Sequence, residues 1–111
     1  MTAPKEFEVT VESAGEEVLV ARVSGDLDLA TSPRFSEALA AAPAARRVVI
    51  DLTDCTFLDS SGVRALVQAV REIPEGERRV DVVAGPAILR VLEITGVDRM
   101  VPVHRTAEDA L

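Results

Sequence analysis

The middle of the chain carries an almost unbroken apolar run, Val48-Val49-Ile50-Asp51-Leu52. A strand of this composition is typical of the centre of a sheet whose two faces are both covered. A helical pattern begins close behind it, near Ser61, so a strand and a helix follow each other directly. At 111 residues the chain is long enough for one domain with a core of its own and too short for two. These features predict a single α/β domain over residues 1–111.

The N-terminal segment predicts a β-hairpin. Phe7, Val9 and Val11 alternate with polar residues, which is the period of a half-exposed strand. Turn residues follow at 13–16, and residues 18–23 form a more apolar second strand. We expect the two strands to pair antiparallel, with the first strand at the edge of the sheet.

Three helices are predicted farther along the chain, each from apolar residues at helical spacing. Ser32 before Pro33 is typical of a helix start, with the serine hydroxyl as N-cap. The third helix opens at Gly85-Pro86, and Gly96 is placed to cap its C-terminus. The second helix begins near Ser61, ends at residues 74–76 and has an inward stripe of Val63, Leu66, Val67, Val70 and Ile73.

Two more strands are predicted at residues 80–84 and 100–103, and a short terminal helix at 106–111. The complete order is β-β-α-β-α-β-α-β-α. Alternation of strands and helices after the hairpin implies parallel pairing through right-handed crossovers. The predicted fold is therefore a small mixed sheet of about five strands, mostly parallel after an N-terminal antiparallel hairpin, with helices packed against it.

Composition excludes several classes of function. The formal net charge of −7, with three Phe and no Trp or Tyr, opposes binding to nucleic acid, which needs clustered cations and stacking aromatics. No apolar run approaches the length needed to cross a bilayer, and the N-terminus lacks the layout of a secretory signal. The single cysteine, Cys55, suits a reducing compartment. We expect a cytoplasmic protein that neither binds nucleic acid nor inserts into a membrane.

The most informative segment for function is the junction between the central strand and the second helix, Cys55-Thr56-Phe57-Leu58-Asp59-Ser60-Ser61-Gly62-Val63. The first turn of a helix has unpaired N–H groups and the positive end of the helix dipole, which favour an anion. A serine there can be neutral or phosphorylated without unfolding the helix. Asp and Ser are also preferred helix caps, so the segment has a purely structural interpretation as well. Capping does not explain two adjacent serines and a glycine that weakens the first turn.

The sequence resembles the STAS domain family, specifically its stand-alone anti-sigma factor antagonists. Residues 49–63 are similar to the family signature, with Asp-Ser-Ser-Gly intact at 59–62. Gly25-Asp26-Leu27-Asp28 matches a Gly-x-Leu-Asp element, and residues 92–98 resemble the late helix-to-loop segment of the family. The resemblance covers nearly the whole chain and implies a STAS-like fold.

The resemblance also implies that Ser61 is a phosphorylation site. In the family, the unphosphorylated antagonist binds an anti-sigma factor that is also a serine kinase and thereby frees the sigma factor. Phosphorylation ends the binding, and a serine phosphatase restores it. No catalytic residue, cofactor or metal is expected in this chain. The partner-binding residues that we predict are Asp28, Asp59, Ser60, Ser61, Gly62 and Arg64.

Other polar residues support weaker alternatives. Arg64 belongs to an outward stripe with Gln68 and Arg71, and such a stripe is usually a solvated helix face. Cys55 is by default a small buried hydrophobe, and His104 is far in sequence from the serine that a hydrolase would need beside it. One Cys and one His make no metal cluster. Two further functions stay open: a soluble STAS subunit of a membrane transport complex, and an enzyme with a serine nucleophile.

Overall fold

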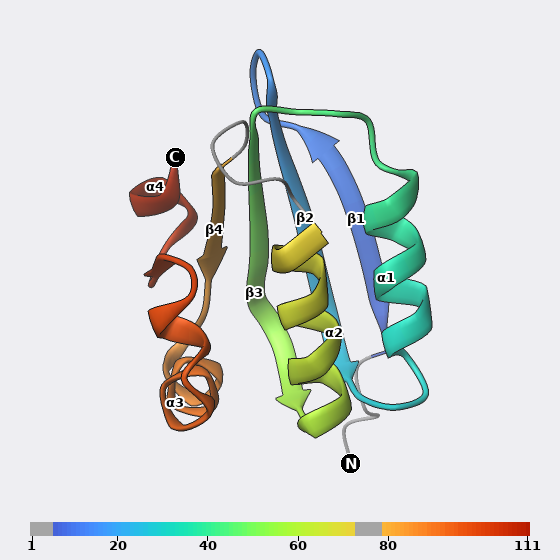
Figure 1. Ribbon diagram of the computed structural model, residues 1–111, viewed down its shortest axis with the longest axis vertical. Helices are drawn as coiled ribbons and strands as arrows, with labels where there is room; N and C mark the ends of the chain where they lie inside the picture. The colour runs from blue at the N-terminus through green and yellow to red at the C-terminus, as the bar shows by residue number, and fades with distance from the viewer. Residues whose placement is uncertain (1–5, 73–78) are drawn as a thin grey trace.

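The computed structural model describes residues 6–72 and 79–111 and has the predicted mixed α/β fold (Figure 1). Within these residues five strands form one sheet in the order β1-β2-β3-β4-β5. β1 (Glu8–Ser13) pairs antiparallel with β2 (Val18–Leu27). The sheet continues in parallel from β2 through β3 (Arg47–Leu58), β4 (Arg79–Val83) and β5 (Val103–His104). The predicted hairpin with its first strand at the sheet edge is confirmed.

Helices connect the parallel strands. They are α1 (Ser32–Ala41), α2 (Ser60–Glu72) and α3 (Pro86–Thr95), followed by the 3-10 turn η1 (Val97–Arg99) and by α4 (Ala107–Ala110). Right-handed crossovers that always advance in the same direction across a sheet place their helices on one face. Buried side chains of α1, α2 and α3 accordingly belong to one hydrophobic cluster, whereas Ala110 of α4 belongs to a second. In Figure 1, α1 and α2 lie side by side in front of the strands.

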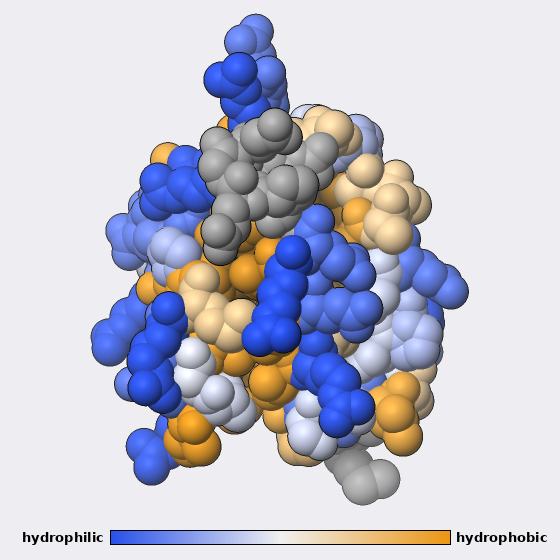
Figure 2. Space-filling model, viewed as in Figure 1, coloured by the Kyte–Doolittle hydropathy of each residue, from blue (hydrophilic) through white to orange (hydrophobic). Residues whose placement is uncertain are grey.

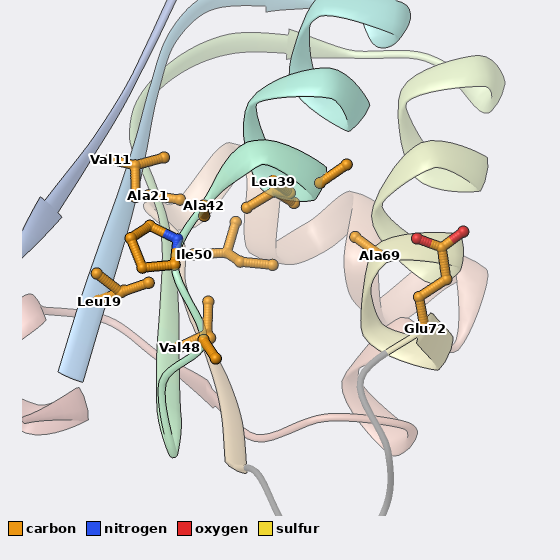
Figure 3. A pocket seen from close by; sticks show the side chains of 12 residues that line it. Val11, Leu19, Ala21, Leu39, Ala42, Val48, Ile50, Ala69 and Glu72 are labelled. Atoms are coloured by element: carbon orange, nitrogen blue, oxygen red, sulfur yellow. The ribbon is translucent and has the colours of Figure 1, made fainter. Parts of the chain in front are cut away.

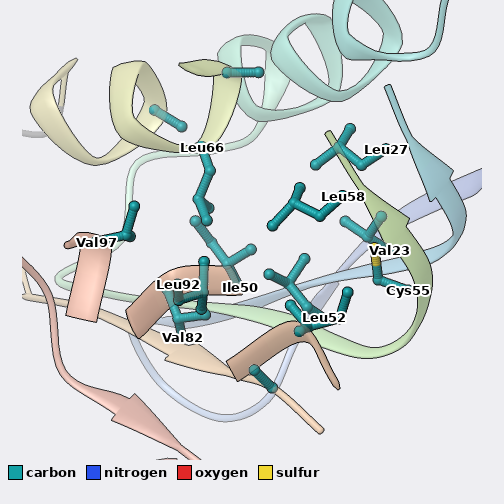
Figure 4. Close-up of a cluster of buried hydrophobic side chains, with 14 of the residues drawn as sticks. Val23, Leu27, Ile50, Leu52, Cys55, Leu58, Leu66, Val82, Leu92 and Val97 are labelled. Carbon is teal, nitrogen blue, oxygen red and sulfur yellow. The ribbon is translucent and has the colours of Figure 1, made fainter. Parts of the chain in front are cut away.

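The main core fills the space between the sheet and these three helices (Figure 4). Ile50 and Leu52 of β3, Leu66 of α2 and Leu92 of α3 are all fully buried there. Figure 4 shows Leu66 directed from its helix toward the strands. Burial of each such side chain contributes about 1.5–3 kcal/mol to the free energy of unfolding. The predicted central strand, β3, therefore forms the sheet side of the core.

β3 extends to Leu58, well beyond the 48–52 strand predicted from the apolar run. The register between β2 and β3 shifts between Arg22 and Ser24 and again between Gly25 and Asp26, with one extra β3 residue at each shift. Such bulges bend a strand and re-aim its side chains. Continuous burial over residues 48–52 gives way to isolated buried positions at Cys55 and Leu58. The second half of the strand therefore shows neither an apolar run nor a period of two in the sequence.

Helix α2 faces the core through smaller residues than predicted. Its buried residues are Gly62, Ala65, Leu66 and Ala69. Of the predicted inward stripe, Leu66 is fully buried, and Val63, Val67 and Val70 are half-buried and pack against the same core. The stripe left out the small buried residues. Small residues on the inward face let the helix approach the strands closely, and the larger ones flank the contact. The predictions for Ile73 and for the helix end at 74–76 lie outside the described residues.

Two predicted boundaries need correction. The N-cap of α1 is Thr31 rather than Ser32, and the Ser32 hydroxyl instead donates a hydrogen bond to the Asp28 carbonyl. β5 begins after Pro102, which has no N–H group for the sheet, although the Pro102 carbonyl still accepts a hydrogen bond from Val82. Gly96 does end α3, with a left-handed φ of 81°. No helix in the described segments is long and apolar enough to span a bilayer.

The face of the sheet opposite α2 carries a fully buried carboxylate, Asp81 of β4. Its oxygens lie 2.9 Å from Arg79 Nε, 3.4 Å from Arg47 Nε and 2.8 Å from His104 Nε2. Burial alone would raise the pKa of Asp81. The hydrogen bonds to His104 and Arg79, with the positive charges of Arg79 and Arg47, outweigh burial and hold that pKa below its ordinary value. Asp81 therefore stays ionised and ties β3, β4 and β5 together.

An apolar pocket of about 350 Å³ lies at the end of α1 and α2 that is far from Ser61 (Figure 3). Figure 3 shows Leu19 and Ile50 from the sheet, Leu39 from α1 and Ala69 from α2 around it. Among its described lining residues only Glu72 is charged. Sites for polar ligands combine an apolar wall with several convergent polar groups. The described walls of this pocket lack that combination.

Candidate functional site at the start of helix α2

Asp59 is the residue that caps α2. Its Oδ1 accepts a hydrogen bond of 2.8 Å from the Gly62 amide, and its carbonyl accepts one of 2.9 Å from the Val63 amide. A carboxylate in this position satisfies a first-turn donor and interacts favourably with the positive end of the helix dipole. The structural role that the sequence allowed for the whole Asp-Ser-Ser segment is thus filled by the aspartate.

The two serines carry no part of the cap. Ser60 is exposed and Ser61 is half-buried, at the first and second positions of α2. In the described parts of the chain, neither hydroxyl takes part in a hydrogen bond. A serine hydroxyl that stabilises nothing in the fold is free to be modified or to contact another molecule. The structure therefore leaves Ser61 available for the role that the motif predicts.

Gly62 is required by a close approach between α2 and the end of β2. A Cβ atom at Gly62 would lie 2.2 Å from the carbonyl oxygen of Leu27 and 2.7 Å from Cδ1 of Leu58. The same Leu27 carbonyl accepts a hydrogen bond from the Asp59 amide, at 3.4 Å. Glycine at this position lets the first turn of α2 sit directly on the end of β2, which fixes where Ser61 lies. That Gly62 also contacts a partner stays a prediction.

Asp28 organises the loop between β2 and α1. Its Oδ1 accepts hydrogen bonds from the amides of Ala30 (3.0 Å) and Thr31 (3.1 Å). The Thr31 hydroxyl closes the loop by donating to the Asp26 carbonyl at 2.7 Å. This side-chain turn is a usual role of aspartate in loops. Asp28 thus has a local structural function, and its predicted contact with a partner stays a prediction.

A shallow groove of about 250 Å³ runs beside Ser61 between the first halves of α1 and α2. We call it the α1–α2 groove. Arg64 and Gln68 lie along its α2 side, which places two residues of the predicted outward stripe beside the serine. Arg71, the third residue of the stripe, is exposed but does not line the groove. The full lining is Leu29, Ser32, Pro33, Ser36, Ser61, Arg64, Ala65 and Gln68.

Two exposed apolar residues near the site were missed from the sequence. Leu29, in the loop organised by Asp28, is 75% exposed, and Phe57, near the end of β3, is 52% exposed. Figure 2 shows hydrophobic residues at the surface in the lower part of the view, where α2 begins in Figure 1. A signal for Phe57 was present, because adjacent strand residues point to opposite faces and Leu58 is apolar too. Leu58 faces α2, so Phe57 lies on the other side of β3. We call Leu29, Ser60, Ser61 and Arg64 the Ser61 face.

Cys55 and His104 have other roles. The Cys55 thiol is buried and lies 3.3 Å from the Phe57 carbonyl, and burial raises its pKa. A thiol in that state is a poor nucleophile. His104 makes its hydrogen bond with Asp81, which alternates along β4 with core residues and so points away from α2. A Ser-His pair between Ser61 and His104 is therefore absent from the described structure.

Comparison with known proteins identifies the family. A family model described as "Mlab, STAS domain" matches residues 9–102. The chain belongs to the STAS domain family. Among STAS relatives, the anti-sigma-F factor antagonist RsfB of Mycobacterium tuberculosis (strain H37Rv) is 30% identical over 113 residues, which cover 100% of this chain and 92% of RsfB. The resemblance seen in the motif at residues 49–63 is thereby confirmed.

Solved structures confirm the STAS fold. The crystal structure of an anti-sigma factor antagonist from Mycobacterium paratuberculosis has a TM-score of 0.88 and 34% identity, covering 99% of this chain and 95% of that one. The structure of the Bacillus cell fate determinant SpoIIAA in its phosphorylated form has a TM-score of 0.70 and 22% identity, covering 93% and 96%. At that lower identity the likeness concerns the fold alone.

Proposed function

We propose that this chain is an anti-sigma factor antagonist that is switched by phosphorylation of Ser61. The observation that carries the proposal is the Ser61 hydroxyl in the first turn of α2, which has no hydrogen-bond partner among residues 6–72 and 79–111 and lies beside the cap supplied by Asp59. Relatives that match most or all of the chain are named as anti-sigma factor antagonists, which supports this class of function. The chain acts as a binding module, and its partner supplies the chemistry.

The partner in this scheme is an anti-sigma factor with serine kinase activity. It binds the Ser61 face, where exposed Leu29 offers an apolar anchor and Arg64 a positive charge. The kinase transfers the terminal phosphoryl group of ATP to Ser61 Oγ and leaves ADP. A phosphatase then hydrolyses the phosphoserine with water and releases inorganic phosphate, which restores the binding form.

Phosphorylation ends binding at the interface while leaving the fold intact. A phosphoserine adds about −1.5 to −2 charges near neutral pH. The helix dipole tolerates this charge in the free protein. In a docked interface the charge must be desolvated close to Asp59. A thousandfold loss of affinity requires only about 4 kcal/mol, which is within the range measured for an uncompensated interfacial charge.

The test is a pull-down from the native lysate with Ser61→Ala and Ser61→Glu as baits. We expect the alanine form to retain a small ATP-binding protein that the glutamate form loses. Ala87→Glu is the matched control, because Ala87 is the exposed second residue of α3 and receives the same charge at the same helix position. The control should bind like the unmodified protein. Identical partners on both Ser61 baits would contradict the switch, and transporter subunits among them would support the alternative of a transport complex.

A further inference from the structure

Arg64 lies on the same side of α2 as Ser61. Residues three apart are neighbours on a helix surface, and side chains of a helix lean toward its N-terminus. This geometry lets the longer Arg64 side chain reach back along the helix toward the position of Ser61. Both residues line the α1–α2 groove, which gives the two side chains a shared space outside the core.

Arg64 has no partner within the described residues. It is exposed and takes part in no ion pair or hydrogen bond there, whereas Arg22, Arg46 and Arg79 each pair with a carboxylate. No acidic residue occupies the first turn of α2. The other polar residue on this side of the groove, Gln68, donates its amide to Glu72 at 3.2 Å. Arg64 is thus the available cation beside Ser61.

We propose that Arg64 binds the phosphate of phosphorylated Ser61 and holds it along the α1–α2 groove. The inference rests on the proposed function, which supplies the phosphate. A guanidinium group matches phosphate oxygens with two parallel charge-assisted hydrogen bonds, and a phosphoserine offers three acceptor oxygens. An Arg64 side chain that is bound to the phosphate is at the same time no longer available to a partner at the Ser61 face. Phosphorylation therefore alters the interface in two ways, by adding negative charge and by engaging Arg64.

The test uses protein in which phosphoserine is installed at position 61 by genetic encoding, and follows the ³¹P resonance over pH at physiological ionic strength. A nearby cation favours the dianion, so its loss raises the pH of the titration midpoint. We expect Arg64→Gln to move the midpoint up by roughly 0.3–0.7 pH units, which is the size of a partly exposed ion pair. Arg64→Lys should retain part of the effect, because it keeps the charge but not the two-pronged geometry.

Arg71→Gln is the matched control. Arg71 is exposed on the same helix, but ten residues from Ser61 correspond to about 15 Å along the axis, beyond the screening length of physiological salt. The control should leave the midpoint within about 0.1 pH units of the unsubstituted protein. Equal shifts for the two glutamine variants, or none for Arg64→Gln in a protein with unchanged amide spectra, would overturn the proposal.

The titration can be measured whether or not the proposed function is right. The phosphate is installed without a kinase, and the resonance is measured without a partner. A phosphate bound by Arg64 together with an unaltered pull-down on the Ser61→Glu bait would overturn the switch alone. A partner lost from that bait with no effect of Arg64→Gln on the titration would overturn the role of Arg64 alone.

Discussion

The carbonyl oxygen of Leu27 lies where a side chain at Gly62 would begin, 2.2 Å from an ideal Cβ. The contact joins the end of β2 to the first turn of α2 and thereby fixes the position of Ser61 relative to the sheet. Real Cβ atoms do not approach backbone oxygens this closely. Either α2 or the end of β2 must move if any other residue replaces Gly62.

Gly62→Ala should therefore destabilise the protein, although alanine favours a helix by about 1 kcal/mol over glycine. Overpacking of a buried site typically costs 1–3 kcal/mol, and here the obstacle is backbone. We expect a net loss of about 2 kcal/mol in the free energy of unfolding, measured by urea titration. Gly85→Ala is the control, since nothing lies within 4 Å of a Cβ there. Equal stability of the two variants would contradict the steric role of Gly62.

Two substitutions at Asp59 should distinguish its role as a helix cap from a role in partner binding. Asp59→Ala removes the acceptor of the Gly62 amide and should lower the free energy of unfolding by about 1 kcal/mol. Asp59→Asn keeps an oxygen acceptor and removes the charge, so its stability should stay close to that of the unsubstituted protein. Urea unfolding of the three proteins gives the comparison. A loss of partner binding in the stable asparagine form would assign Asp59 to the interface as well.

Phosphorylation of Ser61 should leave the fold unchanged. The hydroxyl makes no hydrogen bond to any residue that the structure describes, and the helix N-terminus favours an anion. Amide spectra of the free and phosphorylated proteins should match except at residues near the site, about 57–66. Ser61→Ala should change the free energy of unfolding by less than about 0.5 kcal/mol. Spectral changes across the whole sheet would show that the phosphate acts by refolding.

Periodicity predicted the fold because most elements here are regular. The alternation in β1, the apolar first half of β3 and the helical spacing in α1 and α3 each occur where the structure has those elements. It was incomplete in two places. The second half of β3 is bulged twice and has no regular period, and the predicted inward stripe of α2 left out Ala65 and Ala69, which are too small to stand out in a hydrophobic pattern.

The position of the site could be predicted from the sequence, but the role of each residue in it could not. The motif located Ser61 beside a helix start, and a single sequence cannot tell which of Asp59, Ser60 and Ser61 is the cap. That depends on which oxygen reaches the Gly62 amide. Leu29 was missed because its exposure depends on a loop held by Asp28. The partners of Asp81 come from three strands, and only their pairing brings them together.

The buried ion cluster should make stability depend on pH. The pKa of Asp81 is lower in the folded protein than its ordinary value of about 3.9. The folded state therefore binds fewer protons at this group than the unfolded state. Its contribution to stability is complete above about pH 5 and is lost as pH falls through the unfolded and then the folded pKa.

Asp81→Asn should reveal this contribution. The variant leaves Arg47 and Arg79 without their carboxylate, and we expect a loss of about 2 kcal/mol at pH 7. The difference from the unsubstituted protein should shrink as pH falls below about 4, where Asp81 itself becomes protonated. Urea titrations of both proteins from pH 7 to pH 3 measure this difference in the free energy of unfolding. Glu12→Gln, which breaks an exposed ion pair with Arg22, should change stability by less than about 0.5 kcal/mol. A difference between Asp81→Asn and the unsubstituted protein that stays constant down to pH 3 would mean that the charge of Asp81 does not stabilise the sheet.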